Sequence, residues 1–323
     1  MYVGVQEFDL PKIRLNSSGT LKVSGLPAGL KYVLGTSSIE GIATKDGIYT
    51  VYLTVGKLVS TFTIEVKPLP DWVVGTFEGC GYDSEYDGGR FTCTVSKQGK
   101  VLMKAFYADE KGIYADVTEY QLLRFRDGAF EMEDSGSGVD HDGDYEEWTD
   151  LFVIFEREVN GVSFGSFEGE YYGRWESLYN EYDYGSWVGA IFGVQDVWKK
   201  DISFDFLPEI VNGTEMFVDL TGWKEKSFDD VSWNRPVDGC SLRLKFGKNG
   251  AVTAAFYEPG ATKATGTASA TLMPYDRVGN TVKALLTIAI APKGRHSICV
   301  ALYRDIDVSR GVVYGDDMTV TDY

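Results

Sequence analysis

The residues best suited to chemistry in this sequence are clustered carboxylates. Residues 131–150 hold nine Asp and Glu side chains and no Lys or Arg. Carboxylates at alternating positions of a flexible loop are ligands that a hard cation such as Ca²⁺ prefers. The candidate metal ligands are Asp140, Asp142, Asp144 and Glu146. An EF-hand loop has a Glu at its twelfth position, but counting from Asp140 that position is Leu151, so the spacing does not fit. The alternative interpretation is a solvated acidic hairpin loop.

Aromatic residues are concentrated between residues 164 and 198, beside carboxylates and amides. Exposed Trp and Tyr rings combine a large apolar face with a polar edge, which suits sugar stacking or a protein interface. The candidate ligand-binding residues are Tyr171, Trp175, Tyr179, Tyr182 and Trp187. Because a β-rich core also consumes large aromatic side chains, burial of these rings is the competing interpretation.

Catalytic chemistry has little support, and no catalytic residue is predicted. The two histidines, His141 and His296, lie in no nucleophile motif of a serine or cysteine enzyme. Glu168 and Glu170 would share one face of a strand, about 6–7 Å apart. A glycosidase instead needs carboxylates that face each other across the scissile bond. We therefore expect a protein that is not an enzyme.

The chain has four cysteines, Cys80, Cys93, Cys240 and Cys299, and no C-x-x-C pair. With only two histidines, a structural zinc site is not expected. Cys80 and Cys93 flank a polar, Gly-ended turn between two strand-like runs, and antiparallel pairing there would bring the two sulfurs together. The candidate disulfides are Cys80–Cys93 and Cys240–Cys299, and the alternative is four buried thiols that pack as small apolar groups.

Composition limits the class of protein. The chain of 323 residues carries a formal net charge of −17, and this acidic excess argues against nucleic-acid binding. Hydrophobic residues make up 44%, which provides a packed core and excludes disorder for most of the chain. No run of 18 apolar residues exists, so no membrane span is expected. The first residues, Met1–Val5, carry neither a basic nor an apolar signal region, which fits a cytosolic protein or a segment of a longer one.

Alternation of apolar and polar residues with a period of two runs through the chain. It is clear at Tyr49–Val55, Leu242–Phe246 and Val282–Ile290, and half-buried strands have this period. Turn signals such as Asp46-Gly47 and Asp127-Gly128 lie between the alternating runs, which is typical of hairpins. The pattern predicts an all-β protein with antiparallel sheets.

Two prolines, Pro68 and Pro70, end the first series of strands and predict a domain boundary. Residues 1–67 would form a small sandwich, followed by a larger unit that is barrel-like or a pair of barrels. Within that unit, a Lys-x-Gly turn and an Ala-Phe-Tyr segment occur twice, around Gly99 and Gly250. The repetition predicts two similar halves, 71–185 and 186–323. Duplicated β halves of this kind close on each other and remove exposed strand edges.

The N-terminal segment resembles the immunoglobulin-like domains of large bacterial surface and secreted proteins. The residues that carry the resemblance are the turn and strand of 23–32, the segment 39–43 and the strand of 47–54. It covers about one fifth of the chain, and Gly41-Ile42-Ala43 stands where the family usually has Gly-Thr-Pro. The remainder is more loosely similar to a β-repeat region that follows such domains, through Val74–Gly79 and the Lys-x-Gly turns. The resemblance implies an extracellular or cell-surface location and an adhesive or spacer role.

The sequence therefore favours a non-catalytic extracellular module, adhesive or structural, whose partners are other surface proteins or glycans. The alternative is a carbohydrate-binding component that uses the aromatic-rich face. A β-barrel that carries a small ligand in an enclosed cavity is a weaker third interpretation. No cofactor is expected, apart from the Ca²⁺ that residues 140–146 could bind.

The acidic segment yields a test. If residues 140–146 form only a solvated loop, Ca²⁺ and NaCl of equal ionic strength should change the melting temperature alike, because both act by screening. Substituting Asp140, Asp142 and Asp144 together by Asn should leave that response unchanged. We expect this outcome in thermal melts at millimolar Ca²⁺. A rise specific to Ca²⁺, lost in the triple variant, would instead indicate a binding site, because a ligand of the folded state stabilises it.

Overall fold

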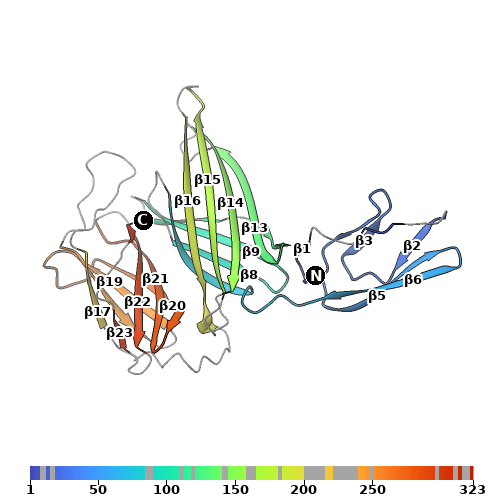
Figure 1. Ribbon diagram of the computed structural model, residues 1–323. Coiled ribbons are helices and arrows are strands. Elements are labelled where there is room, and N and C mark those ends of the chain that lie inside the picture. Colours follow the sequence, from blue (N-terminus) through green and yellow to red (C-terminus); the bar gives the residue numbers. More distant parts are fainter. Residues whose placement is uncertain are drawn as a thin grey trace.

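The computed structural model describes the chain except for residues 8–11, 15–18, 84–89, 110–111, 118–120, 140–144, 158–164, 181–183, 200–214, 221–238, 248–249, 295–297, 308–311, 315–320 and 323. The regular structure of the described part is nearly all β-strand, which confirms the prediction of an all-β protein with antiparallel sheets. Three β units follow one another along an elongated molecule (Figure 1). Among the described residues, no helix is long and apolar enough to cross a membrane.

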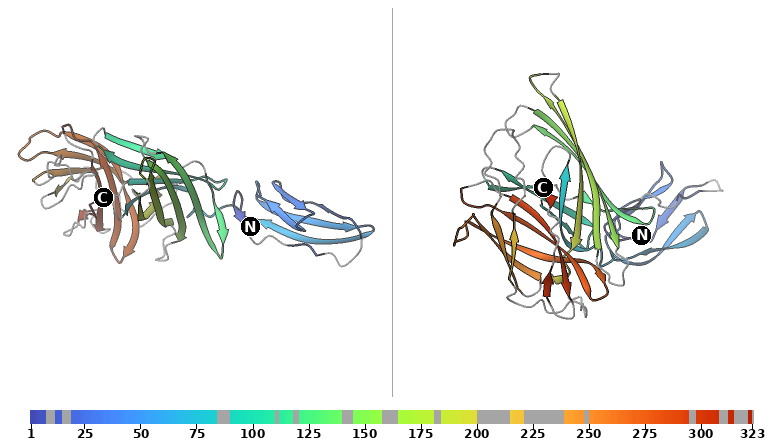
Figure 2. Two further views of the ribbon diagram at one scale, coloured as in Figure 1. Left: turned by 90° about the horizontal axis from the view of Figure 1, so that it is seen from above. Right: turned by 60° about the vertical axis from the view of Figure 1, so that its left-hand side comes forward.

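The first unit projects from one side of the larger body. Its three-stranded sheet contains β2 (Leu21–Ser24), β5 (Gly47–Val55) and β6 (Leu58–Val66), and its two-stranded sheet contains β3 (Leu30–Val33) and β4 (Ser38–Gly41). Val51, Ile39 and Val66 are buried between these sheets as part of one apolar cluster. The turn that joins β5 to β6 lies at the end farthest from the other units (Figure 2).

The second unit is built on an eleven-stranded sheet. Its strands are β1 (Gln6–Glu7), β7 (Gly75–Asp83), β8 (Arg90–Val95), β9 (Lys100–Asp109), β10 (Gly112–Val117), β11 (Gln121–Leu122), β12 (Arg124–Arg126), β13 (Ala129–Val139), β14 (Tyr145–Arg157), β15 (Gly165–Ser177) and β16 (Tyr184–Gln195). β16 pairs with β7, while β11 pairs with β9 and the adjacent β12 pairs with β13. The short segment β11–β12 thereby links two distant strands of the sheet and nearly closes it into a barrel.

Rings and glycines alternate across the inner faces of β15 and β16. Three ring–glycine pairs follow one another in register: Phe167–Gly193, Tyr171–Gly189 and Trp175–Gly185. The glycine is required, because a Cβ on Gly189 would lie 2.1 Å from the Cζ atom of Tyr171. Between these pairs the glycine lies on β15 and the large side chain on β16, as where Gly169 faces Ile191. Each ring therefore packs over the backbone of its neighbour strand, and the two strands can approach and coil closely.

Gln195 fixes the segment where the chain enters and leaves the barrel. Its buried side-chain amide donates hydrogen bonds to the carbonyl oxygens of Asp71 (2.8 Å) and Val74 (2.9 Å). Its Oε1 accepts one from the backbone N–H of Gly165, at 3.1 Å. Three segments distant in sequence are thus held by one fully hydrogen-bonded side chain, which a buried amide requires.

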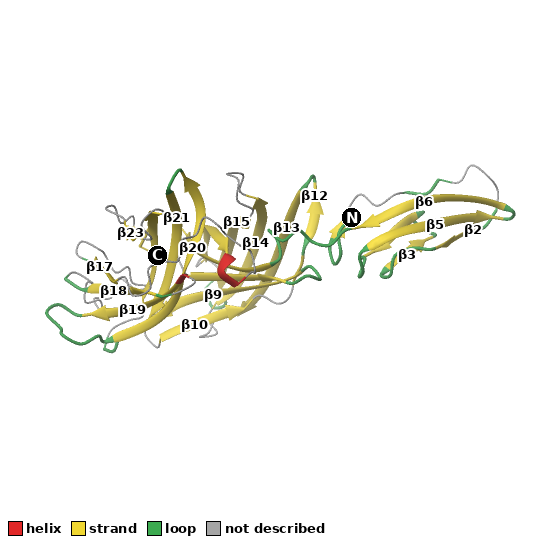
Figure 3. Cartoon of the chain, turned by 90° about the horizontal axis from the view of Figure 1, so that it is seen from below, coloured by secondary structure: helices red, strands yellow, loops and turns green. Residues whose placement is uncertain are grey.

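The third unit is an eight-stranded sheet in the form of a half-barrel, seen from below in Figure 3. The turn η1 (Val197–Lys199) precedes it, and its strands are β17 (Glu215–Asp219), β18 (Ser241–Phe246), β19 (Ala251–Tyr257), β20 (Gly266–Val278), β21 (Thr281–Ile290), β22 (Ile298–Asp307), β23 (Val312–Tyr314) and β24 (Thr321–Asp322). Leu244, Phe256 and Ile288 are fully buried on its inner face.

The predicted repeat corresponds to one equivalent hairpin in each sheet. The hairpins β8–β9 and β18–β19 have the same register, since Val95 pairs with Val101 and Phe246 with Val252. Gly99 and Gly250 occupy the same turn position with φ of 73° and 71°. The Ala-Phe-Tyr segments, however, are displaced by one residue relative to that register. Since side chains alternate between faces, the displacement moves the matched rings to opposite faces of the sheet.

The predicted boundary between residues 185 and 186 is wrong. β16 spans it and belongs to the first large sheet, where it pairs with both β15 and β7. The strand orders of the two large sheets also differ beyond the shared hairpin, because β17–β23 follow sequence order and β7 pairs out of order with β16. The repeat therefore describes a local hairpin rather than two matching halves.

The first unit is joined to the barrel by the N-terminal residues. Val3 donates a backbone hydrogen bond to Lys67, and β1 adds in parallel to β12 of the barrel. The Tyr2 ring packs against Phe130, with ring centroids 4.9 Å apart. Gly4 lies against Gly99, where a Cβ would approach the carbonyl oxygen of Gly4 to 2.4 Å. The junction is therefore packed rather than a loose linker.

The barrel and the half-barrel are joined in the same manner. The indole N–H of Trp198 donates to the carbonyl oxygen of Leu272 at 2.6 Å, and its ring lies over Gly250. Cys80 and Val194 of the barrel form a small buried cluster with Met273 of the half-barrel. In both repeated turns, the glycine therefore packs against the segment that leads into the same sheet: Gly99 against Gly4, and Gly250 against Trp198.

The ring–glycine pairs predict the effect of one added methyl group. Gly189→Ala should destabilise the protein by about 1–3 kcal/mol, because its Cβ has no room under the Tyr171 ring. Gly136→Ala on β13 is the matched control, since no atom lies within 4 Å of its Cβ position. Urea unfolding followed by tryptophan fluorescence measures both. Equal midpoints for the two variants would contradict the packing described here.

Candidate functional site

A groove on the outer face of β14, β15 and β16 is the best-formed candidate site. Its volume is about 500 Å³. Strand alternation creates it, because Val153 and Phe155 of β14 point into the barrel core while Phe152 and Ile154 point outward. The lining residues are Cys80, Phe152, Ile154, Glu156, Glu168, Gly169, Glu170, Ala190, Ile191 and Phe192.

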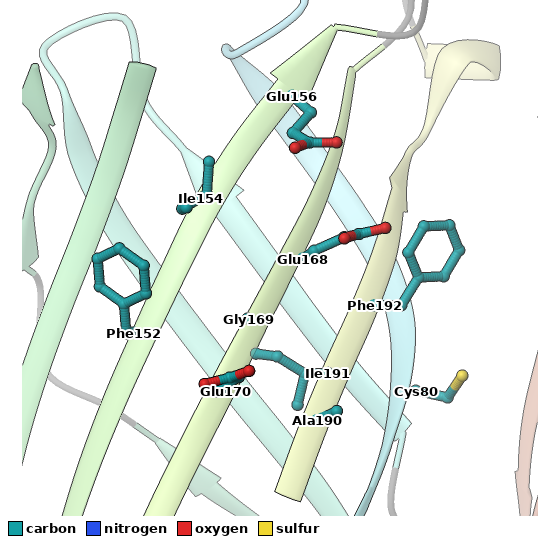
Figure 4. Close-up of a pocket in the computed structure, with 10 residues that line it drawn as sticks. All are labelled: Cys80, Phe152, Ile154, Glu156, Glu168, Gly169, Glu170, Ala190, Ile191 and Phe192. Atoms are coloured by element: carbon teal, nitrogen blue, oxygen red, sulfur yellow. The ribbon is translucent and has the colours of Figure 1, made fainter. Parts of the chain in front are cut away.

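Carboxylates run along the middle of this groove between apolar walls. Glu168 pairs with Ile154 on one side and with Phe192 on the other. Glu170 pairs with Phe152 in the next row. Figure 4 shows the rings of Phe152 and Phe192 on either side of the glutamates. The glutamates are exposed and the flanking apolar side chains are half-buried, so the groove offers negative charge between apolar walls.

A second hollow of about 610 Å³ adjoins the groove. The two share Phe152 and Glu170, and the second adds Tyr172 and Asp150. Its cation, Arg124, forms an ion pair with Glu133. The positive charge in the second hollow is thus already neutralised within the chain, and the combined surface keeps an excess of carboxylates.

The carboxylates of the groove lie side by side rather than facing each other. Glu168 and Glu170 lie on one strand and one face, as their spacing predicts, and do not oppose each other across a gap. The ionisable lining residues are the three glutamates and the buried thiol of Cys80. Within the part of the chain that the structure describes, no three His, Cys, Asp or Glu side chains are placed to hold a metal ion.

The predicted aromatic face is divided by the fold. Tyr171 and Trp175 are half-buried and lie over Gly189 and Gly185 on the inner side of the hairpin, so they do not form an exposed row. Tyr179 is 80% exposed beyond the end of β15. Trp187 lies in β16, where it pairs with Gly173, and Tyr182 is outside the described residues.

The outward-facing residues Phe152, Ile154, Tyr172 and Phe192 were not singled out from the sequence. A signal was available, because in 165–175 every second residue is an aromatic or a glycine and the residues between are Ser, Glu, Tyr and Arg. That alternation by itself separates an inner face of the strand from an outer one.

The predicted Ca²⁺ ligands are placed only in part. Glu146 lies near the start of β14, exposed and paired with Val139. Asp140, Asp142 and Asp144 fall outside the described residues. Cation binding by this segment stays a prediction.

The predicted disulfide between Cys80 and Cys93 is wrong. In the β7–β8 hairpin Cys93 pairs with Phe77, whereas Cys80 pairs with Arg90 three positions farther along. An odd offset places the two sulfurs on opposite faces of the sheet. Cys93 is packed in the barrel core, and Cys80 packs against the half-barrel.

The predicted bridge between Cys240 and Cys299 does not form either. Cys240 is a buried thiol whose Sγ donates to Glu258 at 3.7 Å. Cys299 lies in β22, opposite Ala289.

Burial predicts low thiol reactivity. Desolvation raises the pKa of the Cys93 thiol far above its usual range, so the reactive thiolate is absent at neutral pH. Iodoacetamide should therefore leave Cys93 unmodified in the folded protein, as judged by peptide mass spectrometry. In denaturant without reductant, Cys80, Cys93 and Cys240 should all be alkylated. A peptide containing a Cys80–Cys93 bridge would contradict the register of this hairpin.

Comparisons with protein-family models, with curated proteins and with solved structures find no match for this chain. The immunoglobulin-like resemblance of residues 1–67 is thus carried by the sequence motifs alone.

Proposed function

We propose that this chain is a non-catalytic extracellular module, structural or adhesive, of a bacterial surface or secreted protein. The observation that carries the proposal is the packed joining of three β units into one elongated body (Figure 2). Inter-domain contacts are often small and permit relative motion. Here Tyr2 and Trp198 each insert a ring at a junction, and both junctions also contain backbone or side-chain hydrogen bonds.

Such joints suit a protein whose task is to hold surfaces apart at a fixed spacing. The first unit stands away from the barrels and is tied back at Val3 and Lys67, so its far end keeps a set distance from them. A spacer or an adhesive tip depends on such an extension.

The placement of the aromatic residues favours this role over carbohydrate binding. A planar row of exposed rings is what sugar stacking requires. Tyr171 and Trp175, the central members of the candidate row, instead pack over glycines of β16. These two rings thereby serve the architecture of the barrel.

The proposed location and role are tested on cells and on purified protein. Antibodies raised against the full chain should label intact source cells or detect the chain in the medium. The purified chain should bind no member of a broad glycan array, with or without Ca²⁺. Labelling confined to lysed cells would contradict the extracellular role. Array binding abolished by Tyr179→Ala would establish the carbohydrate-binding alternative.

A further inference from the structure

The far end of the first unit carries exposed apolar side chains beside a cation. At the turn between β5 and β6, Leu58 is 69% and Val59 62% exposed, and Lys57 is exposed next to them. Adjacent exposed apolar side chains on a projecting turn give a partner an apolar surface to bind. β6 also carries no charged side chain from Leu58 to Ile64, although charges commonly protect edge strands from pairing.

Charge is distributed unevenly between this unit and the rest of the chain. Residues 1–67 contain seven Lys and Arg against five Asp and Glu, a net charge of +2. Residues 68–323 contain 24 Lys and Arg against 43 Asp and Glu, a net charge of −19. A weakly basic projection is thus attached to a strongly acidic body. Two such molecules attract when the projection of one meets the body of the other, and repel when their bodies meet.

The groove on β14–β16 complements the Lys57–Val59 tip, the exposed end of the β5–β6 hairpin. Its apolar walls of Phe152, Ile154 and Phe192 match the apolar side chains of the tip. Its three glutamates face solvent, with no Lys or Arg among the lining residues. A hairpin end with two apolar residues and one Lys therefore complements it in both polarity and charge.

We propose that the chain associates head to tail, with the Lys57–Val59 tip of one copy seated in the Glu156–Glu168–Glu170 groove of a second copy. This rests on the proposed structural role of the chain. One molecule cannot fill its own groove, because the tip points away from the barrel (Figure 1). A contact between two different surfaces leaves a free tip and a free groove at the ends, so it extends into a chain of copies.

The contact is small, and this sets its strength. A hairpin end in a 500 Å³ groove buries less than the roughly 1,200 Å² typical of stable interfaces, so association should be weak and dependent on protein concentration. Because opposite charges meet, added salt should weaken it.

Sedimentation velocity of the full chain at low salt measures the association directly. We expect the weight-average sedimentation coefficient to rise with concentration and to fall back as NaCl is added. Lys57→Glu should weaken self-association by at least about tenfold, since it places a like charge against the groove. Lys45→Glu is the matched control, because Lys45 is exposed at the opposite end of β5 and carries the same charge.

Variants of the groove complete the test. Glu168→Lys should abolish association, whereas Glu176→Lys, which changes the charge by the same amount at an exposed position of the same strand, should not. A mixture of the Lys57→Glu chain and the groove variant should regain association, because one intact tip and one intact groove remain and the reversed charges of the other tip and groove are again opposite. Circular dichroism confirms that each variant is folded.

A wild-type chain that stays monomeric at all concentrations would overturn the proposal. Equal effects of Lys57→Glu and Lys45→Glu would also overturn it, because net charge alone would then explain the association. Either result leaves the extracellular location intact, since the antibody experiment decides that separately.

Discussion

The packing of rings over glycines between β15 and β16 is the constraint on which the barrel depends. A large side chain on one strand occupies the space that the missing Cβ on the other strand leaves free. These two long paired strands can therefore coil without a void on their inner face. The same alternation turns Glu168 and Glu170 outward, so the groove follows directly from the inner packing.

Glycine also controls how the units meet. Gly99 and Gly250 lie in equivalent turns with positive φ, which favours glycine for conformational reasons. The space above each of them serves a second purpose: Gly4 packs on the first, and Trp198 packs on the second. A glycine that suits the turn thus also leaves room for the segment that leads into each sheet.

Local patterns in the sequence predicted the elements better than their arrangement. Alternation identified strands such as Tyr49–Val55 and the turns around Gly99 and Gly250, because these depend on neighbouring residues. The boundary at residue 185 failed because β16 pairs with β7, more than one hundred residues earlier. The prediction of a Cys80–Cys93 bridge was wrong because it depends on the register of the β7–β8 hairpin. A shift of one residue moves a sulfur to the other face of the sheet. The groove was missed for a related reason, since its walls come from three strands whose order the sequence does not state.

The closeness of Tyr2 and Lys67 gives the first unit the topology of an insertion. Tyr2 and β1 lie against the barrel, the chain then departs through the sandwich, and it returns beside Tyr2 at Lys67. Insertions whose two ends meet can be exchanged without disturbing the host, as circular permutation and domain grafting show. Evolution could therefore replace the sandwich with a longer, shorter or differently decorated domain while the barrels stay unchanged. The barrel and the half-barrel would then be the constant host, and the sandwich would be the variable domain.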